Sequence, residues 1–211
     1  MKKFSIRQLE AARNNPSAFA ASIKQGTLGS GQFGGRPKSV RWLDAIGVYH
    51  KTSNLSEAIN SLERSFSNRI NTNKNRIEID RLIQALKNYV KEHKKYGYIY
   101  LEKAHPIEII LSTKVKLTGW IWLLNMTADG GRSGYIISKQ IEDNTWKSEL
   151  RFPIIQNYIA NKIYGCNLND VDVGLVDYLT GVHYRTRFSE NIIKNSLKEL
   201  TTIGNTITSL I

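Results

Sequence analysis

The spacing of apolar side chains divides the chain near residue 98. Before that point, apolar positions recur at intervals of three and four residues, as on the buried face of an amphipathic helix. This pattern predicts helices within residues 5–23, 40–49, 55–70 and 77–90. Ser5 and Gln8 have capping-box spacing, and Pro16 is expected to divide the first of these regions into two short helices. We therefore expect an all-helical N-terminal region.

From Tyr98 onward the pattern predicts strands, because short runs rich in Ile, Val, Tyr and Trp replace the helical spacing. The expected strands cover residues 98–101, 107–111, 115–125 and 135–139. Asp129-Gly130-Gly131 is typical of a hairpin turn between the last two. A helix over residues 146–164, with Pro153 near its start, should follow. A second hairpin and a helix that Ser189 caps, ending near Leu200, complete the predicted order.

This order of elements indicates an α/β (α+β) fold. We predict an all-helical N-terminal region at residues 1–97, of which residues 51–97 form a helical insertion or lid, and an α/β core at residues 98–211. The chain has 211 residues, and at that length folding buries about two-thirds of the surface of the unfolded chain. A substantial core is therefore expected without disulfides or structural metal ions.

The net charge of +12 is concentrated in the first half of the chain. Residues 1–105 contain 19 basic and 8 acidic side chains, whereas residues 106–211 contain 11 and 10. A folded chain with this asymmetry presents a positive face, for which a nucleic-acid backbone is a common partner. The alternative is that lysine-rich helices serve only solubility.

Several classes of protein and site are excluded or disfavoured. Cys166 is the only cysteine, which excludes an internal disulfide and cysteine-ligated metal sites. The four histidines are too far apart in sequence to form a metal-binding motif. The longest apolar runs are shorter than the roughly 20 residues that a membrane span needs, and no secretion signal is visible. We expect a cytoplasmic protein with no membrane partner and no cofactor.

A glycine-rich segment, residues 26–38, connects the first two predicted helical regions. It does not match a phosphate-binding P-loop, because it follows a helix and because Pro37 removes a backbone donor. We interpret it as a mobile connector; the alternative is a basic loop that contacts nucleic acid.

Several short motifs occur in a characteristic order. They are Ser5-Ile6-Arg7-Gln8-Leu9 with Asn15-Pro16, Gly47-Val48-Tyr49-His50, Gly119-Trp120-Ile121-Trp122, Ile137-Ser138-Lys139 and Gln156-Asn157-Tyr158. This order resembles the PD-(D/E)XK nuclease superfamily, in its RecB-like branch. The resemblance implies a restriction-endonuclease-like core, in which a mixed sheet is flanked by helices. It also implies that a strand reading Gly-x-Ile-Asp neighbours a strand that ends in Glu-x-Lys.

The two acids of that pattern, which hold Mg²⁺ in the family, are replaced here. The resemblance puts Trp122 at the aspartate position and Ile137 at the glutamate position, and it leaves Lys139 at the lysine position and His50 near the motif histidine. An indole or an alkyl group cannot ligate Mg²⁺, which requires oxygen ligands. We therefore expect a nuclease-like fold without a metal site. The alternative is an active nuclease in which Glu149 has replaced the lost acids and acts with Lys139, using Mg²⁺.

The favoured hypothesis is a catalytically degenerate protein that binds nucleic acid, DNA rather than RNA, or acts as a scaffolding subunit. The resemblance implies a DNA repair or anti-phage and anti-plasmid defence complex with a helicase, ATPase or nuclease as protein partner. The candidate nucleic-acid contacts are Arg36, Lys38, Arg41, Lys51, Lys87, Lys91, Lys94, Lys95 and Lys139. Trp120 and Trp122 share one strand face, and we interpret them as core residues, with stacking on unpaired bases as the alternative. A protein-interaction module, such as an inhibitor or assembly factor, is a further alternative.

Overall fold

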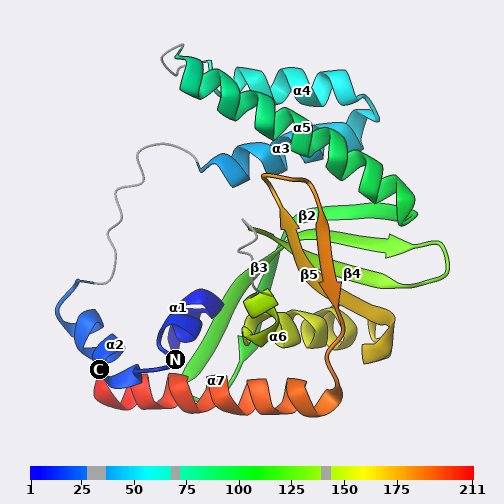
Figure 1. Cartoon of the computed structure of the whole chain (residues 1–211). Helices are drawn as coiled ribbons and strands as arrows, with labels where there is room; N and C mark the ends of the chain where they lie inside the picture. Colours follow the sequence, from blue (N-terminus) through cyan, green and yellow to red (C-terminus); the bar gives the residue numbers. More distant parts are fainter. Residues whose placement is uncertain (28–36, 68–71, 139–143) are drawn as a thin grey trace.

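The computed structural model describes residues 1–27, 37–67, 72–138 and 144–211 (Figure 1). Its strands are β1 (Lys2–Ser5), β2 (Tyr98–Ile110), β3 (Val115–Thr127), β4 (Arg132–Ser138), β5 (Val171–Asp177) and β6 (His183–Thr186). Its α-helices are α1 (Ile6–Ala11), α2 (Pro16–Lys24), α3 (Lys38–Thr52), α4 (Leu55–Arg64), α5 (Asn73–Lys95), α6 (Arg151–Tyr158) and α7 (Glu190–Leu210). The chain has a mixed α/β fold, as predicted.

The strands form one mixed sheet. β2, β3 and β4 are an antiparallel meander, α6 leads from β4 to β5, and β5 runs parallel to β4. β6 returns antiparallel to β5. The two predicted hairpins are thus confirmed, as are the neighbouring positions of the strands that contain Trp122 and Ile137.

The expectation of an all-helical N-terminal region was wrong at its start. β1 pairs in parallel with β3, from Lys2 opposite Val115 to Ser5 opposite Thr118. Phe4 is buried, and Ser5 then caps α1 with the expected capping box. A four-residue strand shows no clear alternation, so only its pairing with β3 defines it.

The strand predicted to end at Leu101 continues to Ile110 as β2. A bulge at Leu101 and a positive φ of 58° at Ala104 interrupt its regular geometry. Among the described residues, β2 pairs only with β3, and an edge strand tolerates the missing donor of Pro106. The predicted helix over 146–164 is instead a 3₁₀-helix (Asn144–Ser148), α6 and a π-helix (Ile159–Tyr164), and α7 continues beyond Leu200.

Two hydrophobic cores lie against the sheet. The first joins α1, α2, α6 and α7 to the strands, with Leu9, Ile121 and Phe152 fully buried. The second joins α3, α4 and α5 to the strands, with Trp42 and Tyr89 at its centre. Figure 1 shows these groups on opposite sides of the sheet, with α3–α5 above it and α7 below. Trp122 is partly buried and contacts both cores.

Candidate nucleic-acid interface

A cavity opens where β3 and β4 separate. Their paired residues run from Met126 opposite Arg132 to Leu123 opposite Tyr135, and no further. β4 then continues to pair with β5 as far as Ser138. On the same side of β3, the pairing with β1 ends at Thr118. Residues 119–122 of β3 therefore have no strand paired on this side in the described part of the chain.

The cavity has a volume of about 560 Å³ and is enclosed by β3, β4, the β1–α1 junction, the start of α3 and α6. Trp122 lines it from β3 and Ile137 from β4. A Cβ atom at Gly119 would lie 2.8 Å from Ile6 Cδ1, so the glycine permits the close approach of α1 to β3. The two positions that the resemblance assigns to metal-binding acids thus line one cavity.

Trp120 and Trp122 form an aromatic wall of this cavity. Their ring centroids are 6.4 Å apart and their planes differ by 30°. The side chain of Trp122 is anchored against the cores, whereas Trp120 is 51% exposed. The interpretation of this pair as core residues was therefore wrong for Trp120, because about half of its ring is exposed in the described structure.

The polar wall of the cavity is positive. Arg7 is exposed, and Arg151 is largely buried with its Nε 2.5 Å from Glu149 Oε2. Burial lowers the pKa of Arg151, and Glu149 acts in the opposite direction; an arginine stays protonated at neutral pH. None of the described residues that line the cavity is acidic. Its lining also includes the first turn of α3, where no described side chain caps the helix.

Glu149, the acid proposed for a relocated metal site, lies in a second hollow next to the cavity. Arg7, Arg151 and Glu10 also line this hollow. Glu10 accepts a hydrogen bond from the Leu150 backbone N–H at 2.7 Å, and burial raises the pKa of Glu10. Both acids are thus engaged by structural partners. No group of three or more His, Cys, Asp or Glu side chains in the described ranges could hold a metal ion.

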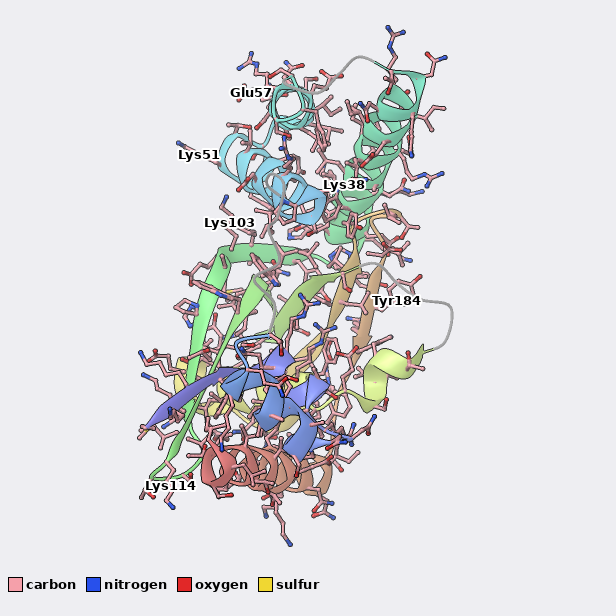
Figure 2. The ribbon with its side chains drawn as sticks, turned by 90° about the vertical axis from the view of Figure 1, so that its left-hand side faces the viewer. Lys38, Lys51, Glu57, Lys103, Lys114 and Tyr184 are labelled. Carbon is pink, nitrogen blue, oxygen red and sulfur yellow. The ribbon has the colours of Figure 1, made fainter. Side chains whose placement is uncertain are left out.

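The predicted basic contacts are distributed over separate parts of the molecule. Arg36 and Lys139 lie outside the described residues. At the start of α3, Lys38 forms an ion pair with Glu78, and Arg41 lies 4.8 Å above the ring of Phe66. Figure 2 shows Lys51 at the other end of α3. Among the described members of the predicted set, none lines the cavity.

Four of the predicted contacts lie on α5. Lys87, Lys91 and Lys94 follow one another at helical spacing and are all exposed, and none of them has an ion-pair partner among the described residues. Lys95 lies 3.9 Å from Glu92. We call Lys87, Lys91 and Lys94 the α5 lysine row.

Three of the four histidines converge, which the sequence spacing did not predict. His50 of α3 and His93 of α5 have ring centroids 4.5 Å apart, and His183 of β6 lies 5.1 Å from Tyr89. His50 Nε2 is 2.9 Å from Tyr89 Oη and its ring stacks on Tyr100. The residue aligned with the motif histidine thus lies in this cluster and does not line the cavity.

These histidines are neutral because burial lowers the pKa of His50 to about 3, of His93 to about 4 and of His183 to about 3. Neither ring nitrogen of His183 has a hydrogen-bond partner in the described structure. Tyr89 and His93 are four residues apart on α5, a helical spacing that indicates one shared face. No comparable signal links them to His183, which is 90 residues further along the chain.

The Gln…Tyr signature also lies away from the cavity. Gln156 is fully buried; its amide donates to the carbonyls of Leu168 and Phe188 at 3.0 and 3.1 Å and accepts from Phe188 N–H at 2.8 Å. Tyr158 is directed toward the backbone carbonyl of Pro106. Gln156 therefore fixes the connection into α7, and Arg151 and Ile155 are the residues of α6 that reach the cavity.

Comparison of the sequence with protein-family models gives no match, and no curated protein matches it either. No helix in the described ranges is long and apolar enough to cross a membrane.

Proposed function

We propose that this chain is a catalytically degenerate protein of the PD-(D/E)XK, RecB-like type that binds nucleic acid without cleaving it. One observation carries the proposal: Trp122 and Ile137 lie on the neighbouring strands β3 and β4 and line a single cavity. The meander, the helix α6 and the parallel return strand β5 agree with the restriction-endonuclease-like core that the sequence resemblance implies.

The cavity chemistry favours binding over cleavage. Nucleases of this type use two carboxylates to hold Mg²⁺, whereas the corresponding positions here provide an indole and an alkyl chain, neither of which ligates a hard cation. Arg7, Arg151 and the start of α3 instead supply positive charge and backbone dipoles that suit a phosphate group. The site therefore keeps an attraction for nucleic acid after the loss of the metal ligands.

The biological context follows from the resemblance. We propose that the chain acts beside an active partner, a helicase, ATPase or nuclease, in a DNA repair or anti-phage and anti-plasmid defence complex. DNA is the favoured ligand. In such a complex the chain holds or positions the strand on which the partner acts.

The test is a fluorescence-anisotropy titration with labelled DNA and RNA at 50, 100 and 200 mM salt. Affinity should fall linearly with salt on logarithmic axes, because protein cations displace counterions from the backbone. Arg7→Ala should weaken binding by about tenfold, an effect on the order of one charge-assisted contact. Lys114→Ala is the matched control, since Lys114 is exposed at the far end of the molecule from α3–α5 (Figure 2). Salt-independent binding, or equal losses in both variants, contradicts the proposal.

Two alternatives give different results in the same preparations. An active nuclease would cleave the labelled strand with Mg²⁺, stop with EDTA and lose activity in Glu149→Ala. A protein-interaction module would show no affinity for any nucleic acid at 50 mM salt while still binding a protein partner. The ion pair between Glu149 and Arg151 disfavours the first of these.

A further inference from the structure

The outermost aromatic ring of the cavity is free to accept a planar ligand. Trp120 is about half exposed, whereas the two tryptophans outside the cavity are buried: Trp42 completely, Trp146 to 4% exposure. An exposed indole this large is unusual on a soluble protein surface, since aromatic rings dominate the burial of apolar area. Trp122 lies behind Trp120, with a ring-plane difference of 30°, and its contacts with both cores fix the orientation of the aromatic wall.

The cavity is the size of a site for a small ligand. Its volume of about 560 Å³ lies within the range of 300–1,000 Å³ that is usual for such sites. A base-paired duplex cannot place a base in it, because paired bases lie inside the helical stack and a protein reaches their edges only with an element that protrudes into a groove. The walls here are recessed between α1, the start of α3 and α6. Only a nucleotide that has left its base pair reaches Trp120 and Trp122 together.

Groups that suit the remaining parts of a nucleotide lie around the same cavity. Arg7 and the first turn of α3 suit a phosphate, through a guanidinium and through helix-terminal amides. Residues 119–122 of β3 have no strand paired on this side, so their backbone groups are available to the polar edge of a base. Aromatic, polar and positive groups, which suit the base, its edge and the phosphate, therefore line one cavity.

Building on the proposed function, we propose that the cavity selects single-stranded nucleic acid, by stacking one unpaired base on Trp120 with a phosphate held by Arg7. Arg151 is positioned by Glu149 and reinforces the positive wall from α6. The stacking contact tolerates any base, since every base presents a π-face. The ligand class is thus a single strand or an unpaired segment without a required sequence.

The experiment compares three labelled ligands of one length at 100 mM salt: a mixed-sequence single strand, the same strand with abasic sites throughout its centre, and a blunt duplex. The backbone charge of the two single strands is identical, so their difference reports base contacts alone. We expect the abasic strand to bind about fivefold to a hundredfold more weakly, the range that one stacked base provides. The single strand should also bind more tightly than the duplex.

Variants of Trp120 assign the effect to this ring. Trp120→Ala should remove the advantage of the base-bearing strand, whereas Trp120→Phe, which keeps a ring, should retain most of it. Ile110→Ala removes another exposed apolar side chain, which lies outside the cavity, and it should change nothing. Trp120→Ala should keep its fold, because the ring is about half exposed; circular dichroism verifies this.

The outcomes separate the two proposals. Equal affinity for the base-bearing and abasic strands, with normal salt dependence, overturns the stacking proposal and leaves the proposed function standing. Tighter binding of the duplex than of the single strand also overturns the stacking proposal and leaves the proposed function standing. Absence of binding to all three ligands overturns the proposed function, and the stacking proposal with it. Loss of the base effect in Trp120→Ala alone supports both.

Discussion

Aromatic side chains are buried at one end of the β3–β4 pair and line an open cavity at the other. Where the strands pair, Tyr135 and Asn125 are sealed beneath α5 with the histidine cluster, and Tyr98 Oη lies 2.5 Å from Tyr135 Oη. Where the strands separate, Trp120 and Trp122 line an open cavity. Aromatic residues of one strand pair thus serve a closed core at one end and an accessible wall at the other.

The two regions also differ in charge: the closed one is neutral at its histidines, and the open one is positive. Burial keeps His50, His93 and His183 neutral, so the closed region carries no charge on its imidazoles at neutral pH. The open region has the charged groups Arg7 and Arg151. The part of the pair that α5 covers thus contains neutral imidazoles, whereas the part where the strands separate presents charged arginines and an exposed indole.

The largest expected effect is a loss of stability in acid that originates in the closed region. The folded-state pKa values of the three histidines lie below the unfolded value of about 6.5, so the unfolded chain binds more protons as the pH falls below 6.5. Their stabilising contribution is present above pH 6.5 and is lost progressively toward pH 4 and below. Each contributes a slope of up to about 1.4 kcal/mol per pH unit to the free energy of unfolding.

Urea unfolding at pH 7, 6, 5 and 4 measures this slope. His183→Phe should give a shallower pH dependence than the natural chain, because Phe fills the space between the tyrosine rings and does not titrate. His105→Ala serves as the control, since His105 lies outside the cluster beside Glu102. Identical slopes for the natural chain and His183→Phe would remove this account of the cluster.

The second effect contrasts one tryptophan from each region. Trp42 is fully buried, donates from Nε1 to the Leu82 carbonyl at 3.1 Å and contacts the edge of Tyr89. Trp42→Ala should lower the free energy of unfolding by about 3–5 kcal/mol, because it leaves a cavity and removes the hydrogen bond from the indole to the Leu82 carbonyl. Trp120→Ala should change it by less than about 1 kcal/mol. Comparable losses in urea unfolding would mean that Trp120 is a packing residue after all.

The sequence pattern predicted much of the closed region and the two strands that border the cavity. The helical spacing placed Leu43, Ile46 and Tyr49 on one buried face of α3, and all three are buried. The strands of Trp122 and Ile137 were expected to be neighbours, which β3 and β4 confirm. The buried face of α3 follows from periodicity, which a short window of sequence contains, whereas the neighbouring strands were expected from the hairpin turn at residues 129–131 and from the family resemblance.

Other features depend on contacts between distant segments. β1 is a strand only because Lys2–Ser5 finds an unpaired part of β3, and the cavity exists because that pairing and the β3–β4 pairing both stop short of residues 119–122. The convergence of His50 and His183 needs α3 and β6 to meet beside α5. The spacing of apolar residues within one helix or strand does not show where a strand pair ends. It also does not show which distant elements come into contact.

The third effect tests whether the positive surface extends beyond the open region. If the α5 lysine row follows the nucleic-acid backbone away from the cavity, replacing Lys87, Lys91 and Lys94 with Glu should reduce the salt slope of binding by about 2–3 and the affinity by about a hundredfold at 0.1 M salt. Folding should be unaffected, because all three side chains are exposed. An unchanged slope would confine the interface to the cavity.

The smallest expected effect concerns the acid at the border of the open region. Glu149 holds Arg151 through an ion pair, so Glu149→Gln should free part of the guanidinium charge for the cavity and raise affinity for a single strand about two- to threefold. The fold should lose more than the roughly 1 kcal/mol of a fully exposed pair, because Arg151 is largely buried and Gln leaves its charge without a counter-ion. Anisotropy titration of the natural chain and Glu149→Gln, with Glu190→Gln as a control that removes an exposed acid on α7, measures the change. A Mg²⁺-dependent cleavage that Glu149→Gln abolishes would instead assign this carboxylate to a metal site and reverse the contrast between a binding cavity and a catalytic one.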